Sequence, residues 1–430
     1  MKGLIITYVI AAFGAGASIF APVVGLQIYA LFSTLRPQVL FGWAGSMEGL
    51  SQAVAIPMLL GWAGRAFGSW RLGRARGLVI CLLGYFAWNI VSTLASFNPD
   101  AGWPHILERA KIVLPFLVGV TMFRSMKDAR LLAWIIVVAH GYVSFELNLR
   151  YLSGFNEVAM LGYGSMDNNT FAISLVATVG PALFLGLSAE RLWQKGLAFA
   201  CAALIVHTVL LTFSRGGILA LGLTGVVCFL VMPKRPLYIA AIVVSALVTV
   251  RFTGPELAER FSTIFVQGDE RDASAASRLE LWRDCFDAMQ KRPIFGLGPG
   301  NWRRMAAEYG WSEGKEAHSL WFQTGAELGV PGLGFLLLFY LLAALRGIQL
   351  IRKGKGKDPW LVTCGCYTTT SVAGFVVAAQ FVTVEGLEVA YFTVLVLAAT
   401  LRLQDEQAEA APLKQPAVTM PYSLRPAASR

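Results

Sequence analysis

The stretch LAFACAALIVHTVLLTF, residues Leu197–Phe213, contains no charged residue and continues an apolar run that begins near residue 195. A helix needs about 20 mostly apolar residues to cross a membrane, and in lipid only helices or closed barrels satisfy the backbone. Strands of a barrel would alternate apolar and polar residues over about ten positions, and this stretch does not alternate. We therefore interpret it as a transmembrane helix.

Comparable runs recur along the 430 residues, of which 56% are hydrophobic and only 14% are charged. Soluble domains carry about 25% charged residues, so this composition predicts an all-α polytopic membrane protein. Spans are expected near residues 49–66, 77–95, 107–123, 129–150, 170–188, 195–213, 216–232, 236–252, 327–345, 360–382 and 387–403. Residues 1–35 contain either one broken span or two short ones divided near Pro22, which makes the total about 12 or 13.

The net charge of +10 is concentrated in short loops between the apolar runs. Residues 65–76 and 346–358 are the clearest examples, and such loops are typical of the cytoplasmic side. Alternating crossings then place the large polar loop, residues 254–325, on the outer side of the membrane. No combination of basic and aromatic residues suggests binding to nucleic acid.

Three regions follow from this pattern. Residues 1–194 form an N-terminal transmembrane region, and residues 195–403 combine further spans with the large outer loop. Residues 404–430 have no apolar period and are expected to be a disordered cytoplasmic tail. The six cysteines predict neither a disulfide within the loop nor a metal site.

The first candidate functional residue is Arg215, in the sequence SRGG between two apolar runs. An arginine this close to hydrocarbon is either a snorkelling anchor or a binding group. The two glycines favour binding, because they allow a ligand or another backbone to approach closely. A guanidinium at the outer boundary is well suited to phosphate, and Ser214 is a supporting position.

The second candidate is Arg278, in an amphipathic helix of the loop in which Leu279, Trp282 and Phe286 share helical spacing. If Ser274 or Ser277 caps this helix, Arg278 lies in its first turn, where a cation is unfavourable unless an anion binds nearby. An ordinary solvated arginine is an equal alternative. The glycine-rich stretch at residues 293–301 lacks the features of a nucleotide loop and is interpreted as a structural turn.

The third candidate is His318, at the end of the polar loop, where Arg215 and Arg278 are also expected. A lone histidine is usually structural, but an imidazole is the natural general base for an alcohol. No second histidine stands at a metal-site spacing, so no metal is expected. Gln323 follows one turn later as a supporting position.

Two weaker groups lie at other outer boundaries. Asp167 and Asn168 follow the loop that ends near residue 166, and Arg109 lies between Glu108 and Lys111 at the outer end of its span. Polar residues there either pair with one another or line a cavity.

The order of these motifs resembles the O-antigen ligase/polymerase superfamily. SRGG at a span boundary is followed by SRLELW…KRPIFGLGPGNW and then by AHSLWFQTGAELGVPGLG, over roughly residues 195–345. The N-terminal half, with Asp-Asn-Asn after an outer loop, is most similar to the O-glycosylation ligases of exosortase A systems. Ser319 departs from the asparagine that follows the histidine in many ligases and polymerases, although His-Ser is usual in the exosortase-linked subgroup.

The resemblance implies a metal-independent glycosyltransferase of the GT-C type that needs no organic cofactor. Its donor would be a glycan on undecaprenyl pyrophosphate, presented at the periplasmic face of a bacterial inner membrane. Its acceptor would be a hydroxyl of a lipid, glycan or protein. By motif, Arg215 and Arg278 would bind the donor pyrophosphate, and His318 would deprotonate the acceptor. The residues themselves fit this chemistry, because fixed guanidinium donors stabilise the charge that develops on a pyrophosphate leaving group.

Three functions remain open at this point. A ligase or oligosaccharyltransferase that inverts the anomeric carbon is favoured, and a polymerase of the same superfamily is the first alternative. A flippase is the third, but it would be expected to place charges near the membrane midplane. Here the candidate residues gather at one face.

Overall fold

The computed structural model describes residues 2–41, 49–236, 238, 269–354, 356, 358–384 and 386–410. The expected span near 236–252, residues 254–268 of the loop and residues 411–430 therefore lie almost entirely outside the described residues. The described part is all-helical and contains no strand, apart from an isolated bridge between Tyr163 and Met166. The predicted fold class is confirmed in this respect.

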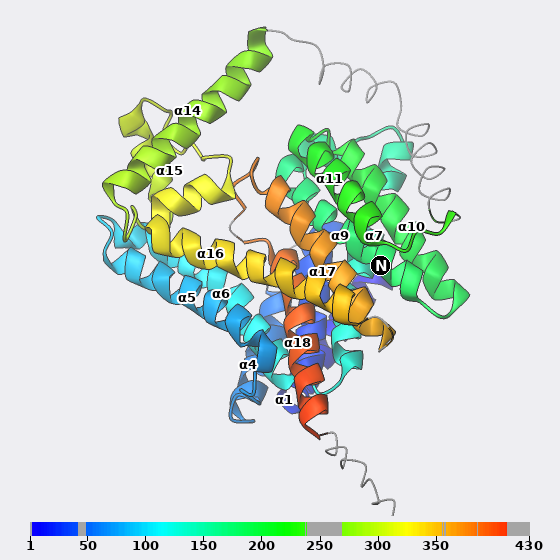
Figure 1. Cartoon of the computed structure of the whole chain (residues 1–430). Helices are drawn as coiled ribbons and strands as arrows, with labels where there is room; N and C mark the ends of the chain where they lie inside the picture. The colour runs from blue at the N-terminus through cyan, green and yellow to red at the C-terminus, as the bar shows by residue number, and fades with distance from the viewer. Residues whose placement is uncertain are drawn as a thin grey trace, which may run out of the picture.

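The helices pack into one bundle (Figure 1). They are α1 (Lys2–Phe20), α2 (Pro22–Leu35), α3 (Pro37–Leu40), α4 (Leu50–Ala63), η2 (Gly73–Ala75), α5 (Arg76–Leu94), α6 (Pro99–Met122), α7 (Met126–Leu152), α8 (Glu157–Leu161), α9 (Asn168–Ser188), α10 (Leu192–Leu211), α11 (Arg215–Val231), α14 (Asp269–Lys291), α15 (Trp302–Met305), η3 (Ala306–Tyr309), α16 (Leu320–Lys353), α17 (Pro359–Ala378) and α18 (Glu388–Ala410). Helices α14 and α15 lie together at the upper left of Figure 1.

Seven segments of the described chain are long and apolar enough to cross a membrane, which makes this a multi-pass membrane protein. They are Gly3–Phe20, Gly73–Leu94, Met126–Leu152, Asn168–Ser188, Leu192–Leu211, Leu320–Lys353 and Pro359–Ala378. Three shorter apolar helices, α2, α4 and α11, accompany them. The total of about 12 or 13 spans remains a prediction.

The N-terminal segment contains two helices that turn back on each other at Ala21. A side chain added at Gly14 would meet Ile28, and one added at Gly25 would meet Ser18, so α1 and α2 pack antiparallel. Pro22 stands in the first turn of α2, where its missing N–H is not needed. Of the two alternatives for residues 1–35, the structure therefore contains the pair of helices.

The two ends of the helical bundle gather different loops. At one end, Arg65 donates hydrogen bonds to the carbonyls of Ile19 and Phe20, and Arg74 pairs with Asp405. These residues come from the loops and helix ends that we expected on the cytoplasmic face. The segments that were expected on the opposite face meet around a cavity, described below.

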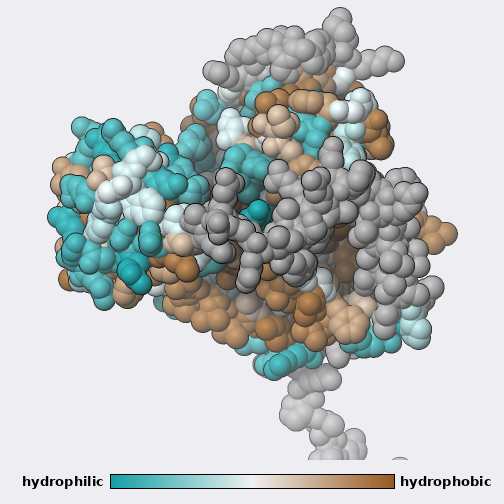
Figure 2. Space-filling view, turned by 90° about the horizontal axis from the view of Figure 1, so that it is seen from above, coloured by the Kyte–Doolittle hydropathy of each residue, from teal (hydrophilic) through white to brown (hydrophobic). Residues whose placement is uncertain are grey.

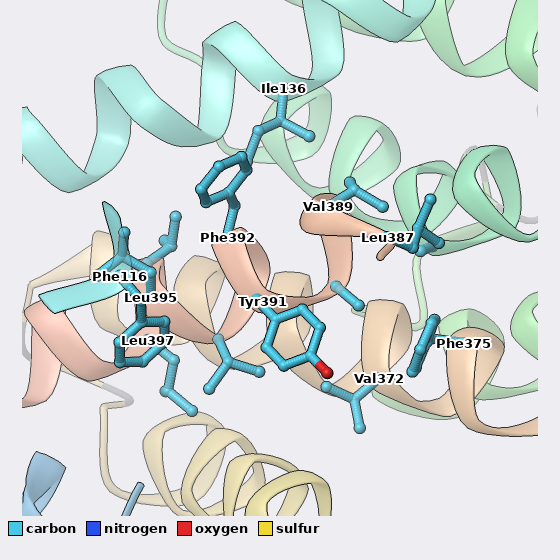
Figure 3. Close-up of a cluster of buried hydrophobic side chains, with 14 of the residues drawn as sticks. Phe116, Ile136, Val372, Phe375, Leu387, Val389, Tyr391, Phe392, Leu395 and Leu397 are labelled. Atoms are coloured by element: carbon cyan, nitrogen blue, oxygen red, sulfur yellow. The ribbon is translucent and has the colours of Figure 1, made fainter. Parts of the chain in front are cut away.

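Helix α18 is the centre of the bundle, and its residues Val389–Leu403 are all buried. Figure 3 shows Phe392 and Leu395 of this helix among Phe116 of α6, Ile136 of α7 and Phe375 of α17. The helix continues to Ala410, beyond residue 403, where we expected the tail to begin.

The described part of the polar loop forms a small lobe with its own apolar core, made by α14, α15, η3 and the first turns of α16. Leu281, Cys285 and Trp302 are buried in this core. Hydrophilic residues cover this lobe on the left of Figure 2, and hydrophobic residues form a band beside it. The loop thus folds over the end of the bundle as a compact unit.

A break at Gly329 separates the first turns of α16 from its long apolar part. The φ of Gly329 is 65°, and the glycine-rich stretch packs into this break, with Leu297 N–H donating to the Ala326 carbonyl at 3.0 Å. Gly296, Gly298 and Gly300 also have positive φ, which a glycine adopts without strain. The stretch is therefore a structural turn, as its sequence indicates.

One expectation about the loop helix is wrong. Helix α14 begins at Asp269, so Arg278 lies in its third turn rather than its first. The buried face contains Leu281, Cys285 and Ala288, whereas Leu279 and Phe286 are exposed. The sequence pattern identified the helix but not its buried side, because that side is chosen by contacts with α15 and α16.

Candidate functional site

A cavity of about 520 Å³ opens where the lobe meets the end of the bundle. Its walls come from the end of α2, the start of α9, α14, the segment before α16 and the segment between α17 and α18. The lining residues are Arg36, Ser165, Met166, Asp167, Asn169, Thr170, Arg278, Glu316, His318, Phe381, Val382, Thr383, Val384, Gly386 and Leu387. Two of the three main candidates, Arg278 and His318, thus share one cavity.

His318 is positioned by the hydrogen bonds of the residues on either side of it, Ala317 and Ser319. Trp282 Nε1 donates to the Ala317 carbonyl at 3.0 Å, and the Ala317 N–H donates to Gln323 Oε1 at 3.1 Å. Ser319 caps α16 by accepting a hydrogen bond from the Phe322 N–H. Between these anchors His318 adopts a φ of 50°, an uncommon value for a residue with a side chain. Such strain at a cavity wall is typical of a functional position.

Gln323 links the segment before α16 to the segment between α17 and α18. Besides Ala317, its Oε1 accepts a hydrogen bond at 3.1 Å from the Thr383 hydroxyl on the opposite wall. Its side chain is almost fully buried, and its Nε2 donates to Glu327 Oε1 at 3.3 Å. Gln323 does not line the cavity but fixes the position of the segment that carries His318.

The charges around His318 favour its neutral form. Burial, together with the positive charges of Lys315 and Arg278, lowers the pKa of its imidazole, and Asp167 opposes this shift. A neutral imidazole accepts a proton, as a general base must. The geometry and the electrostatics of the site therefore agree.

Arg215 lies beside this cavity, at the first position of α11. Ser214 caps the helix, with its Oγ accepting a hydrogen bond from the Gly217 N–H at 3.1 Å. A side chain at Gly216 would approach the Phe381 Cβ to 2.8 Å, so SRGG packs directly against the cavity wall. Arg215 also contributes, after burial, to the lowered pKa of Arg278, because the two positive charges repel.

Neither arginine is neutralised by the described part of the chain. Within those residues Arg215 and Arg278 form no hydrogen bond or ion pair, and Arg278 is half-buried. Asp167 and Glu316 line the same cavity, but Asp167 caps α9 and Glu316 pairs with Arg303. The repulsion between Arg215 and Arg278 would be relieved by a bound anion. The arrangement is suited to an anion with several oxygen atoms.

The Asp-Asn-Asn stretch lies at the cavity and supports it. Asp167 caps α9 by accepting a hydrogen bond from the Thr170 N–H at 2.8 Å, and Asn169 lines the cavity. Asn168 donates to the Thr212 carbonyl at 3.0 Å and so links the start of α9 to the turn before Arg215. These two helix ends are thereby held together.

Arg109 lies elsewhere. It is buried between α5 and α6, with its Nε 3.3 Å from the Tyr85 hydroxyl and its guanidinium over the Tyr85 ring. Glu108 and Lys111 pair with each other at 2.5 Å. The structure does not bring Arg109 to the cavity with His318.

Arg36 lines the cavity and was not among the residues selected from the sequence. It stands between α2 and α3, directly before Pro37. An arginine at the outer boundary of an apolar run is the same signal that identified Arg215. Its approach to His318 depends on contacts between segments more than 100 residues apart, which a single sequence does not reveal.

The cavity at this end of the helical bundle thus combines Arg36, Arg278 and His318 with the carboxylates of Asp167 and Glu316. Residues 197–337 match the O-antigen ligase family (Wzy_C), and this match includes Arg215, Arg278 and His318. It covers about a third of the 430 residues. A search among curated proteins found no match.

Proposed function

We propose that this protein is a glycosyltransferase of the O-antigen ligase or O-oligosaccharyltransferase type. It transfers a glycan from undecaprenyl pyrophosphate to an acceptor hydroxyl at the periplasmic face, without a metal ion. The observation that carries this proposal is the cavity in which His318 and Arg278 face the same space, with Arg215 beside it. The basic loops at the other end of the bundle support the periplasmic orientation.

In the proposed reaction His318 takes the proton of the acceptor hydroxyl, and the hydroxyl oxygen attacks the anomeric carbon of the donor. The bond from that carbon to the pyrophosphate oxygen breaks, and its electron pair leaves with the undecaprenyl pyrophosphate. Arg215 and Arg278 stabilise the negative charge that develops there. One direct displacement inverts the configuration of the anomeric carbon.

Reconstitution tests this function. The purified protein in liposomes would receive undecaprenyl-pyrophosphate-linked glycan and candidate acceptors, and the products would be weighed by mass spectrometry. One glycan block joined to a lipid or protein acceptor supports a ligase, whereas a lengthening glycan on the carrier would replace it with a polymerase. Movement of unchanged donor between leaflets, without any transfer, would contradict both and indicate a flippase.

The same assay tests two finer statements. Transfer in the presence of EDTA is expected at the untreated rate, and a loss that a divalent cation restores would contradict the metal-free mechanism. We also propose a link to exosortase systems, which the His318-Ser319 pair supports. Exosortase genes next to this gene would support that link, and their absence from its neighbourhood would count against it.

A further inference from the structure

Arg36 occupies an uncommon place in the chain. It closes α2 with its N–H donating to the Phe32 carbonyl and adopts a φ of 45° before Pro37 opens α3. The left-handed conformation costs a non-glycine residue of the order of 1 kcal/mol. Because Arg36 lies far outside residues 197–337, the family match does not account for it.

The chain around Arg36 is fitted to its side chain. One guanidinium nitrogen donates to the Gly164 carbonyl, and the Tyr163 hydroxyl donates to the Leu35 carbonyl. A side chain at Gly164 would come within 2.3 Å of the Arg36 Cδ, so only glycine leaves room for this arginine. The Arg36 side chain is therefore held in place against the loop before α9.

Arg36 also stands where two spaces meet. Besides the cavity with His318, it lines a larger cavity of about 880 Å³ between α2, α4 and α6. Apolar side chains, among them Phe32, Met58, Leu59 and Leu114, make up much of that second wall. An anionic head at Arg36 can thus face His318 while an apolar chain lies in the larger cavity.

Among the described residues, the guanidinium of Arg36 forms one hydrogen bond, to the Gly164 carbonyl. Its other guanidinium donors are not used there. Three acidic residues lie nearby. Asp167 and Glu316 share the cavity with His318, where Asp167 caps α9 and Glu316 pairs with Arg303. Glu388 lines the larger cavity beside Arg36, and no ion pair joins these two in the described part of the chain. A guanidinium with free donors is suited to phosphate oxygens.

We propose that Arg36 is a third phosphate-binding residue, which holds the pyrophosphate of the lipid-linked substrate while the larger cavity receives the adjoining lipid. This inference rests on the proposed function for its choice of ligand. It assigns a substrate-binding role to the N-terminal region and makes the site a composite of two distant parts of the chain.

The test measures binding without transfer. Undecaprenyl pyrophosphate that carries no glycan would be titrated into the purified, detergent-solubilised protein, and its affinity compared among variants. Arg36→Gln is expected to weaken binding by about tenfold or more, because charge-assisted hydrogen bonds are lost. Gly164→Ala should weaken it too, because the added methyl group displaces Arg36 without changing any charge. The matched control Arg304→Gln, on an exposed surface of the lobe, should stay within about twofold.

Two further variants separate binding of the pyrophosphate head group from binding of the lipid chain. Ala55→Phe, in the wall of the larger cavity, should weaken binding of undecaprenyl pyrophosphate but not of inorganic pyrophosphate. Arg36→Lys should bind more weakly than the wild type, and it serves if Arg36→Gln does not fold, as judged by size-exclusion chromatography and thermal unfolding. Wild-type affinity in folded Arg36→Lys and Gly164→Ala proteins would overturn the role of Arg36, and wild-type affinity in Ala55→Phe would overturn the lipid path.

Failure of this inference is distinguishable from failure of the proposed function. Weak binding by the Arg36 variants in a protein that transfers no glycan would leave the phosphate and lipid site standing and remove the transferase. Normal binding by those variants in an active transferase would remove only Arg36.

Discussion

The two ends of the helical bundle use arginine in opposite ways. At the end with the basic loops, Arg402 is buried and donates to the carbonyls of Thr121 and Phe123, and Arg74 pairs with Asp405 at 2.6 Å. At the cavity end, Arg215 and Arg278 find no such partner among the described residues. Arginines whose donors are used by the protein are structural, whereas arginines whose donors face a cavity are available to a substrate.

The largest effect is expected at the histidine between the cavity-end arginines. His318→Ala should lower the rate of glycan transfer by about 10²–10⁴-fold, since a general base contributes that much. Donor binding should change little, because His318 acts on the acceptor. Initial rates and donor affinity of the purified variant test this, and transfer at the wild-type rate would remove His318 from the mechanism.

Arginine-to-lysine variants at the two ends of the bundle should differ in their rates of glycan transfer. Arg215→Lys and Arg278→Lys are each expected to lower transfer about 10–100-fold, because lysine loses the planar fork of donors. Arg74→Lys at the opposite end should leave the rate within about twofold, because its ion pair with Asp405 lies away from the cavity. If all three variants keep normal rates, the cavity-end arginines are anchors rather than binding groups.

Replacing an arginine with a structural role should lower the stability of the protein rather than its transfer rate. Arg402→Met is expected to lower the unfolding temperature, because two buried carbonyls lose donors at a cost of about 1–3 kcal/mol each. The transfer rate per mole of folded protein should remain close to that of the wild type. A variant that unfolds normally but no longer transfers glycan would place Arg402 in the functional machinery instead.

The smallest expected effect concerns pH. Because burial and nearby cations lower the pKa of His318, the base is active above that pKa and the rate falls as pH drops through it. Lys315→Gln removes a positive charge, so the pKa rises and the acid limb of the pH–rate profile moves to higher pH by about a few tenths of a unit. Arg304→Gln is the control that should not move it. A shift to lower pH, or none, would contradict this electrostatic account.

Much of the bundle could be predicted because lipid imposes one simple constraint on the sequence. The expected spans 77–95 and 170–188 correspond to α5 and α9 within two residues at each end. Less regular features were harder. The break at Gly329 and the buried side of α14 depend on contacts between the lobe and α16, which no local pattern contains.

The candidate site was predictable in part for the same reason. Arg278 and His318 were selected from local sequence, and the structure brings both to one cavity. Arg36 was missed, and Arg109, a supporting candidate, lies away from the cavity with His318. Both positions depend on packing between helices that are distant in the sequence. Helix boundaries are local properties, but the side chains that meet across them are not.

A pyrophosphate site at the cavity requires that the arginines at the two ends of the bundle contribute differently to binding of the donor lipid. Affinity for undecaprenyl pyrophosphate should be measured for Arg215→Gln/Arg278→Gln and for Arg65→Gln/Arg74→Gln, each in the folded, purified protein. We expect the first pair to lose about 100-fold or more, from two sets of charge-assisted hydrogen bonds, and the second to bind like the wild type. Equal affinity in both double variants would contradict a pyrophosphate site at the cavity.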